Sequence, residues 1–325
     1  MPVQITLIGL GQIGASMGLA LGAHKESILR VGSDKKIEAE REAVKRGAVD
    51  KVIHNLPSAV REARLVVLSL PLSQVRQTLE VIAPDLLAGT VVLDTAPVKT
   101  EVFNWTKELL PDGCYHVGLA PALNPKVLHN LNPGMEAARA DLFAKGLFAV
   151  NALPGAPEQA VTLASDFVRL LGATPLLADM AESDGLMAVT HLLPQLAAAA
   201  VLNATVDQPG WQEARKLAGR PFATVTSGLA YHDGIDSLRI SSQHGRTNIV
   251  HALDVLMAAL KGLRDDIEKG NEGGVAERLE AALEGRERWL SERMAADWSE
   301  TTSRPVDIPS FVERLFGTAT AKPRR

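Results

Sequence analysis

A glycine-rich turn near the N-terminus constrains the fold more than any other feature of this sequence. Gly9, Gly11 and Gly14 follow a short apolar run at residues 5–8 and open a helical pattern. In a strand–turn–helix unit, such glycines permit the tight turn, let the backbone approach a pyrophosphate, and let helix and strand pack closely. The helix N-terminus then offers N–H groups and a partial positive charge to phosphates. The predicted dinucleotide contacts are Gly9, Gly11, Gln12, Ile13 and Gly14.

An acidic residue follows at the spacing that a dinucleotide site requires. The second strand-like run, residues 28–33, ends before Asp34, which comes about twenty residues after the last glycine. A carboxylate there accepts hydrogen bonds from the adenosine ribose and repels a ribose 2′-phosphate, which favours NAD over NADP. Lys35 and Lys36 leave NADP open, because they either pair with a 2′-phosphate or begin the solvated face of the next helix.

The composition points to small-molecule chemistry. The 325 residues carry a formal net charge of −4, and no Lys/Arg cluster accompanies the few aromatic residues, so we expect no nucleic-acid partner. The single cysteine, Cys114, excludes an internal disulfide and favours a reducing compartment. Because no signal-peptide pattern is visible, we expect the cytoplasm. His, Asp and Glu show no metal-ligand spacing, so no metal is predicted.

Two domains are predicted, at residues 1–178 and 179–325. In the first, short apolar runs alternate with helical patterns, which is typical of a doubly wound parallel sheet of the Rossmann type. In the second, long helical patterns at residues 182–206, 247–270 and 275–295 indicate an all-α domain. Strands are expected at residues 5–8, 28–33, 65–70, 90–93, 114–119, 147–150 and 174–177.

The first of those long helices is unusually apolar. It contains His191, Pro194, Gln195 and Asn203, which suit a lipid environment poorly, so we expect no membrane partner. A helix rich in Ala and Leu needs burial on more than one face, which predicts a homodimer built on the helical domain.

Several segments in order resemble the prephenate and arogenate dehydrogenase family. Residues 8–17 are similar to its nucleotide loop, residues 47–50 to its second-helix terminus, and residues 134–143 to the loop before a late strand. Residues 68–71 resemble the strand end beneath the cofactor riboses, which adds Leu70 and Pro71 to the expected cofactor contacts. Residues 188–197 resemble its interdomain helix, with a histidine followed by proline.

The resemblance implies oxidative decarboxylation of prephenate to 4-hydroxyphenylpyruvate, as in tyrosine biosynthesis. It also implies a helical dimerisation domain like that of 6-phosphogluconate dehydrogenase. This chemistry needs a proton acceptor for the hydroxyl group, a nicotinamide near the reacting carbon, and cations for the substrate carboxylates. The chain departs from the family at two such places. Ala120 stands where the family has its catalytic histidine, and Pro97 stands where it has a serine.

Four other residues are candidates for the substrate chemistry. His191 lies on the interdomain helix that lines the cleft in the family, and an imidazole suits proton transfer near neutral pH. Lys99 follows a strand end, where sheets of this type place their ligands, and is a candidate for holding a carboxylate. Arg239 and Arg246 are further carboxylate candidates, although a solvated loop is the favoured interpretation of them and of the nearby His244. His116, on the strand that leads to Ala120, is interpreted as an ordinary strand or surface histidine.

Two alternatives to a prephenate-type dehydrogenase stay open. One is a reductase of the β-hydroxyacid dehydrogenase superfamily acting on another small carboxylic acid, although the paired-asparagine helix motif of that group is missing. The other is a dinucleotide-binding sensor or partner protein without catalysis, which Ala120 favours.

Overall fold

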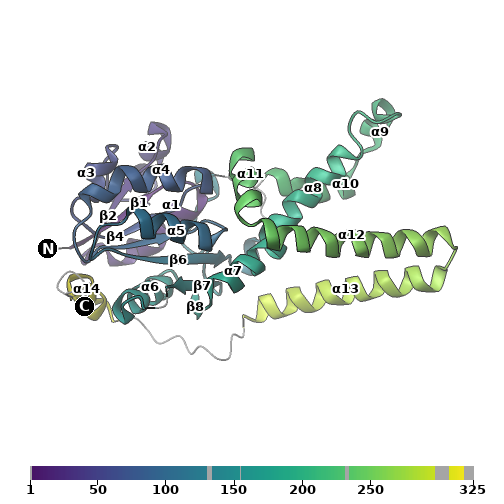
Figure 1. The fold of residues 1–325 in the computed structure, drawn as a ribbon. Coiled ribbons are helices and arrows are strands. Elements are labelled where there is room, and N and C mark those ends of the chain that lie inside the picture. Colours follow the sequence, from purple (N-terminus) through teal and green to yellow (C-terminus); the bar gives the residue numbers. More distant parts are fainter. Residues whose placement is uncertain (1, 130–133, 154, 231–233, 297–306, 318–325) are drawn as a thin grey trace.

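The computed structural model describes residues 2–129, 134–153, 155–230, 234–296 and 307–317. One eight-stranded sheet has the order β3-β2-β1-β4-β5-β6-β7-β8, and the helical region projects away from it (Figure 1). The strands are β1 Val3–Ile8, β2 Ile28–Ser33, β3 Lys51–Val52, β4 Ala63–Leu68, β5 Val91–Asp94, β6 Tyr115–Ala122, β7 Leu147–Ala152 and β8 Thr174–Leu177.

Helices cover both faces of this sheet. The nucleotide-binding half contains α1 Gln12–Ala20, α2 Ile37–Lys45, α3 Leu56–Val60, α4 Leu72–Ile82, α5 Lys99–Leu109 and α6 Glu158–Leu170. Its 3-10 turns are η1 Leu21–His24, η2 Ala83–Asp85, η3 Pro125–Val127 and η4 Met135–Ala137. Helices α1 and α6 share one apolar core, and α3, α4 and α5 pack on the opposite face in a second core. The doubly wound sheet is therefore confirmed.

The sheet differs from the expectation in one strand. β7 pairs antiparallel with β6, placing Ala149 opposite Ala120, and it then pairs parallel with β8. The expected strands otherwise appear with small shifts in their ends, and the two-residue strand β3 is additional. Strand direction is set by the path of the connecting chain, which apolar runs alone do not reveal.

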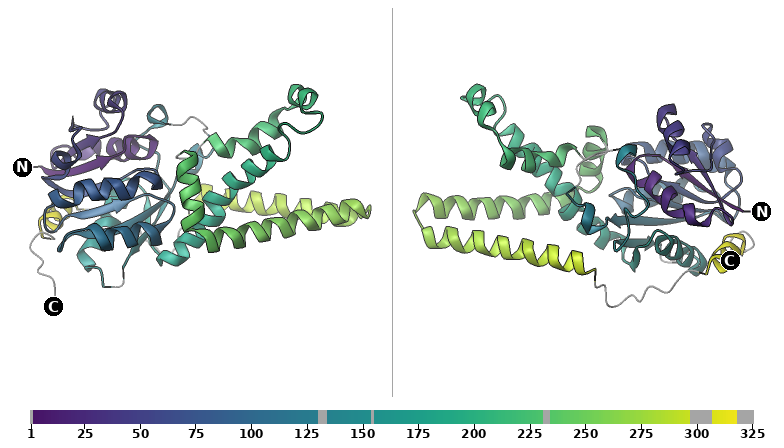
Figure 2. Two further views of the ribbon diagram at one scale, coloured as in Figure 1. Left: turned by 45° about the horizontal axis from the view of Figure 1, so that its top comes forward. Right: turned by 180° about the vertical axis from the view of Figure 1, so that it is seen from behind.

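Only helices follow β8 among the described residues. They are α7 Met180–Met187, the π turn η5 Ala188–Leu192, α8 Leu193–Asn203, α9 Trp211–Leu217, α10 Arg220–Thr226, the 3-10 turn η6 Ser227–Ala230, α11 Ile235–His244, α12 Arg246–Glu268, α13 Glu272–Ala295 and α14 Ile308–Gly317. Figure 2 shows α12 and α13 as a long hairpin and α8–α10 as a second arm. The expected solvated loop around Arg239 and Arg246 is wrong, because α11 and the start of α12 are helical there.

The last described helix returns to the nucleotide-binding half. Phe311 and Leu315 of α14 are fully buried in the same apolar core as α6, and Arg314 pairs with Asp166 of α6 (Figure 1). Residues 297–306 and 318–325 lie outside the described part of the chain, and α14, which comes between them in the sequence, is packed. The interval 179–325 is therefore helical throughout its described part without being one separate packing unit.

One helical segment, Met180–Asn203, is long and apolar enough to cross a membrane by length and composition alone. It is interrupted by the π turn η5, which is followed by Pro194. Proline lacks the N–H that a regular helix needs there, so the chain takes a wider turn. A single helix of this kind does not mark a membrane protein, since helices buried between protein surfaces share its composition.

Candidate functional site: a dinucleotide edge and an adjoining buried charge cluster

The glycine turn joins β1 to α1 by contacts that no larger residue permits. Gly9 has a φ of +92°, and a Cβ atom there would lie 2.2 Å from the carbonyl oxygen of Ser69. A Cβ atom on Gly14 would lie 2.0 Å from the carbonyl oxygen of Gly9. Strand β1, helix α1 and the end of β4 therefore meet backbone to backbone. The predicted roles of the first and third glycines in this turn agree with these contacts.

Helix α1 differs from its two neighbours in what lies at its N-terminus. Side chains of the helical region accept the N–H groups that begin α4 and α5: Ser237 Oγ accepts from Leu72 N at 3.0 Å, and Asp184 accepts from Lys99 N and Thr100 N. No side chain of the described residues accepts a hydrogen bond from the N–H groups that begin α1. Because unpaired N–H groups at a helix N-terminus bind anions, α1 is the helix of the three best suited to a pyrophosphate.

The carboxylate of Asp34 connects β2 to this turn. Its Oδ2 accepts a hydrogen bond from Leu10 N at 2.7 Å, and its Oδ1 accepts one from Lys36 N at 2.9 Å. Buried Glu40 supports the same turn, since its Oε1 accepts from Asp34 N at 3.1 Å and lies 3.0 Å from His54 Nδ1. Asp34 is thus held beside the glycine turn, where an adenosine ribose would lie.

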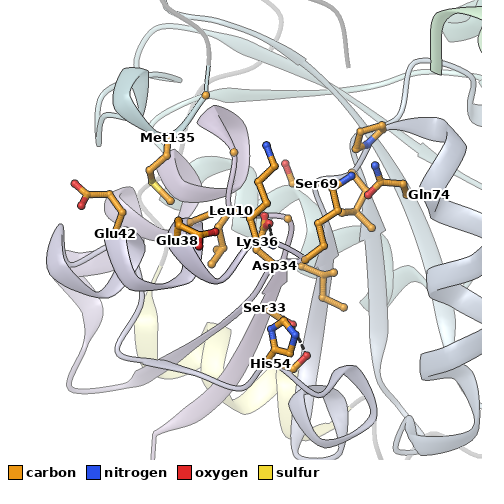
Figure 3. A pocket seen from close by; sticks show the side chains of 18 of the residues that line it. Leu10, Ser33, Asp34, Lys36, Glu38, Glu42, His54, Ser69, Gln74 and Met135 are labelled. Atoms are coloured by element: carbon orange, nitrogen blue, oxygen red, sulfur yellow. Dashed lines mark hydrogen bonds between the residues drawn. The ribbon is translucent and has the colours of Figure 1, made fainter. Parts of the chain in front are cut away.

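A cavity of about 1250 Å³ opens over these residues (Figure 3). Gly9, Gly11, Asp34, Leu70 and Pro71 of the predicted cofactor set line it. Gln12, Ile13 and Gly14 are not among its lining residues and belong to the first turns of α1 behind it. The charged residues of its wall are Asp34, Lys35, Lys36, Glu38, Glu42 and Glu136.

One wall of the cavity comes from a segment far along the chain. Gly134, Met135 and Glu136 line the cavity beside α2. Arg46, which directly follows α2, donates to the carbonyl oxygens of Met135 and Ala138, and Arg139 N donates to Ser16 Oγ of α1 at 3.0 Å. The sequence singled out residues 134–143 only through family resemblance; the structure shows that they close the dinucleotide side of the site.

The sheet edge beyond β4, at the ends of β5 and β6, is lined by buried residues. Ala120, near the end of β6, and Pro97, in the turn after β5, are both buried and have no titratable group. Beside them, Lys99 is fully buried, and its Nζ lies 2.9 Å from Asp94 Oδ1. His116 Nε2 lies 2.8 Å from Asp94 Oδ2. The predicted substrate contact through Lys99 does not fit this burial, because its ammonium is turned into the protein. His116 is likewise a buried partner of Asp94 and not a surface histidine.

Burial and pairing shift the pKa values of this cluster. Burial raises the pKa of Asp94, but the charge of Lys99 and the hydrogen bond from His116 outweigh it, so this pKa lies below its ordinary value. Burial lowers the pKa of Lys99, and the Asp94 carboxylate offsets only part of that effect. The pair is therefore a buried charge pair that depends on both partners.

The remaining predicted residues lie on the helical region. His191 is exposed within the π turn, and its carbonyl oxygen accepts from Gln195 Nε2 at 2.8 Å. Arg239, on α11, is exposed and lies 3.6 Å from Asp236. Arg246 is the exposed first residue of α12. The three residues lie on three different elements, η5, α11 and α12. Near them, His244 Nδ1 lies 3.2 Å from Glu101 Oε2 of α5.

Sequence reasoning missed the residues that join the two halves, Asp184 and Ser237. Both act on backbone N–H groups that lie far away in the sequence, and neither sits in a motif. Among the described residues, no group of three or more His, Cys, Asp or Glu side chains is placed to hold a metal ion.

These features define a nucleotide-binding protein of the Rossmann class with an appended helical region. Residues 17–176 match the family described as prephenate dehydrogenase, nucleotide-binding domain. The nucleotide-binding domain of this chain is therefore similar to that of the prephenate dehydrogenases.

The chain is also similar to individual members of that family. It is 28% identical over 195 residues to a cyclohexadienyl dehydrogenase of Zymomonas mobilis subsp. mobilis, a match that covers 60% of this chain and 64% of the relative. It is 26% identical over 202 residues to the prephenate dehydrogenase of Bacillus subtilis, covering 62% of this chain and 53% of that one. The matches thus span just over half to under two thirds of these relatives' lengths.

A solved structure shares the fold over a longer span. The prephenate dehydrogenase from A. aeolicus, in complex with hydroxyphenyl propionate and NAD+, superposes with a TM-score of 0.76 at 18% identity. This similarity covers 89% of the present chain and 98% of the other, so it includes the helical region.

Replacing Lys99 tests the buried charge pair. We expect Lys99→Met to lower the free energy of unfolding by about 3–5 kcal/mol, because Asp94 is left charged and buried. Asp94 stabilises the fold above its unfolded pKa, and this contribution is lost as the pH falls through its folded pKa. Without Lys99 the folded pKa of Asp94 rises, so acid unfolding should begin at a higher pH. Urea and pH titrations measure both effects, and exposed Lys107→Met is the control. Equal stability of the two variants would contradict the prediction.

Proposed function

We propose that this protein is an NAD-dependent dehydrogenase that oxidises a small carboxylic acid of the prephenate or arogenate type. The observation that supports this most directly is the dinucleotide edge, where the uncapped N-terminus of α1 lies beside Asp34 and an open cavity. The similarity of residues 17–176 to the prephenate dehydrogenase nucleotide-binding domain supports the same activity. When bound, the nicotinamide supplies the hydride acceptor.

The residues of the cavity favour NAD as the cofactor. Four carboxylates, Asp34, Glu38, Glu42 and Glu136, face two lysines, Lys35 and Lys36, along its wall. A ribose 2′-phosphate adds negative charge to a wall that is already acidic, whereas ribose hydroxyls donate hydrogen bonds to Asp34. Lys35 and Lys36 reduce this preference without reversing it.

The ends of β5 and β6, where the substrate would lie beside the nicotinamide, lack a proton acceptor at positions 97 and 120. A residue that accepts the hydroxyl proton has to come from outside positions 97 and 120, because proline and alanine have no suitable group. His191 is our candidate for this role, with Arg239 and Arg246 for the substrate carboxylates. All three are exposed on the helical region.

Buried Ala120 and Pro97 also favour a second candidate function, a sensor that binds the dinucleotide without oxidising a substrate. The two functions predict the same cofactor affinity and differ only in turnover, so a single assay with a binding control separates them.

Turnover with prephenate and arogenate tests the leading proposal. With NAD and either acid, we expect the purified protein to produce the absorbance of reduced nicotinamide. If the base is what limits the rate, Ala120→His should raise kcat by about a hundredfold, the typical size of a general-base contribution. Ala122→His, two residues further along the same strand, is the control. Tight NAD binding without turnover in the wild type or in Ala120→His would favour the sensor instead.

Substitution of Asp34 tests cofactor choice. We expect Asp34→Ala to weaken NAD binding by about tenfold to a hundredfold, since hydrogen bonds to a charged group contribute about 1.5–3 kcal/mol. NADP binding should weaken less. Asp34→Asn keeps an acceptor for Leu10 N but removes the charge, so it should narrow the difference between the two cofactors. Calorimetric titration measures both affinities, with exposed Asp112→Asn as the control. Equal losses for NAD and NADP would contradict the assignment.

A homodimer formed through the helical region is the expected assembly, in the cytoplasm. Only 22% of the most apolar window of Met180–Asn203 is buried within the chain, and Leu186 and Val189 are about half exposed. In sedimentation equilibrium we expect a dimer that Leu186→Glu and Val189→Glu weaken by at least about tenfold, because each would bury a charge. Val44→Glu, on α2, introduces the same charge on a similarly exposed valine and should leave the dimer intact. A monomer at all concentrations would rule out this assembly.

A further inference from the structure

One buried carboxylate holds the turn that follows β5. Asp94, the last residue of that strand, is fully buried. Its Oδ1 accepts hydrogen bonds from Ala96 N at 2.8 Å and from Lys99 Nζ at 2.9 Å. Its Oδ2 accepts from His116 Nε2 at 2.8 Å. Oδ1 therefore holds the backbone of the turn, and the hydrogen bond from His116 of the neighbouring strand β6 fixes Oδ2.

His116 has one polar contact among the described residues. Its side chain is 4% exposed, and its ring packs against Phe103 of α5 with ring centroids 5.9 Å apart. Its second nitrogen, Nδ1, is buried and makes no hydrogen bond in the described part of the chain. A buried polar atom without a partner is destabilising relative to one that is paired. The ring therefore affects its surroundings chiefly through Asp94.

The turn held in this way borders the second half of the dinucleotide site. The strand order reverses between β1 and β4, so a dinucleotide lies across the ends of both strands. The cavity beside Asp34 takes the adenosine half, which leaves the ends of β4 and β5 for the nicotinamide half. Thr95 N, in the turn, donates to the carbonyl oxygen of Leu68 at the end of β4 at 3.1 Å. The turn is thereby fixed against the strand end that the nicotinamide would meet.

The helical region fixes the other end of the same turn. Asp184 of α7 accepts from the backbone N–H groups of Lys99 and Thr100, where the turn becomes α5. The charged groups around the Asp94 carboxylate are therefore Lys99, which pairs with it, and Asp184, whose charge acts on Lys99. Among the contacts that fix the turn, the hydrogen bond from His116 is the one that orients the Asp94 carboxylate from β6.

We propose that His116 is a positioning residue for the nicotinamide half of the cofactor. It orients Asp94, and Asp94 gives residues 95–98 the shape that the bound nicotinamide requires. His116 itself touches no ligand. The inference rests on the proposed binding of a nicotinamide dinucleotide, and it assigns a role to a histidine that takes no part in the proposed proton transfer.

Two ligands separate this role from general stability. NADH contains the nicotinamide, whereas ADP-ribose contains only the remainder of the molecule. We expect His116→Leu to weaken NADH binding by about tenfold while ADP-ribose binding changes by less than about twofold, as measured by calorimetry. His116→Gln retains an N–H donor at a similar reach and should restore most of the NADH affinity.

The control is a buried residue on the opposite face of the sheet. Leu163→Ala in α6 is expected to destabilise the protein because it leaves a cavity, with NADH and ADP-ribose binding unchanged at temperatures where the variant is folded. Equal weakening of both ligands by His116→Leu, or no weakening of either, would overturn the inference alone. Failure of the wild type to bind either ligand would instead overturn the proposed function, and the inference with it.

Discussion

The tightest steric constraint in this structure is the close approach of the Gly9 and Gly14 Cα atoms to backbone carbonyl oxygens. Because a Cβ atom at either position would lie only 2.0–2.2 Å from a backbone oxygen, strand β1, helix α1 and the end of β4 come together only through glycine. That meeting directs the N-terminus of α1 at the centre of the sheet edge. The position of Asp34, the cavity and the wall at residues 134–136 are all arranged around it.

The two sides of the sheet edge at the carboxyl ends of the strands differ in how exposed their charged groups are. On the adenosine side, polar groups such as Asp34 face an open cavity and remain available to a ligand. On the β5–β6 side, the charges of Asp94 and Lys99 pair with each other inside the protein, and the buried residues Ala120 and Pro97 are apolar. Cofactor binding and substrate chemistry are therefore separable in this chain, and a dehydrogenase and a sensor differ only in the second half.

Side-chain contacts that no local sequence pattern displays explain why single residues were hard to interpret from the sequence. Lys99 follows a strand end, where a ligand contact was a reasonable prediction, but its side chain turns inward to Asp94. His116 looked like an ordinary strand residue, and it proved to be the second partner of the same carboxylate. The segment around Arg239 looked like a polar loop because its apolar residues are few, yet Leu238 and Ser237 anchor it as helix α11 against α4.

The sequence by itself determined the class of fold, the glycine turn, the position of Asp34 and the order of most strands. These depend on local features, namely backbone sterics and hydrophobic periodicity, that a chain displays residue by residue. The tertiary structure decided the antiparallel direction of β7, the return of α14 to the nucleotide-binding half, and the inward orientation of Lys99. The first two depend on which distant segment each element meets, and the third depends on the buried Asp94 carboxylate five residues earlier. In each case the partner sets the free energy of burying a charge or an apolar face.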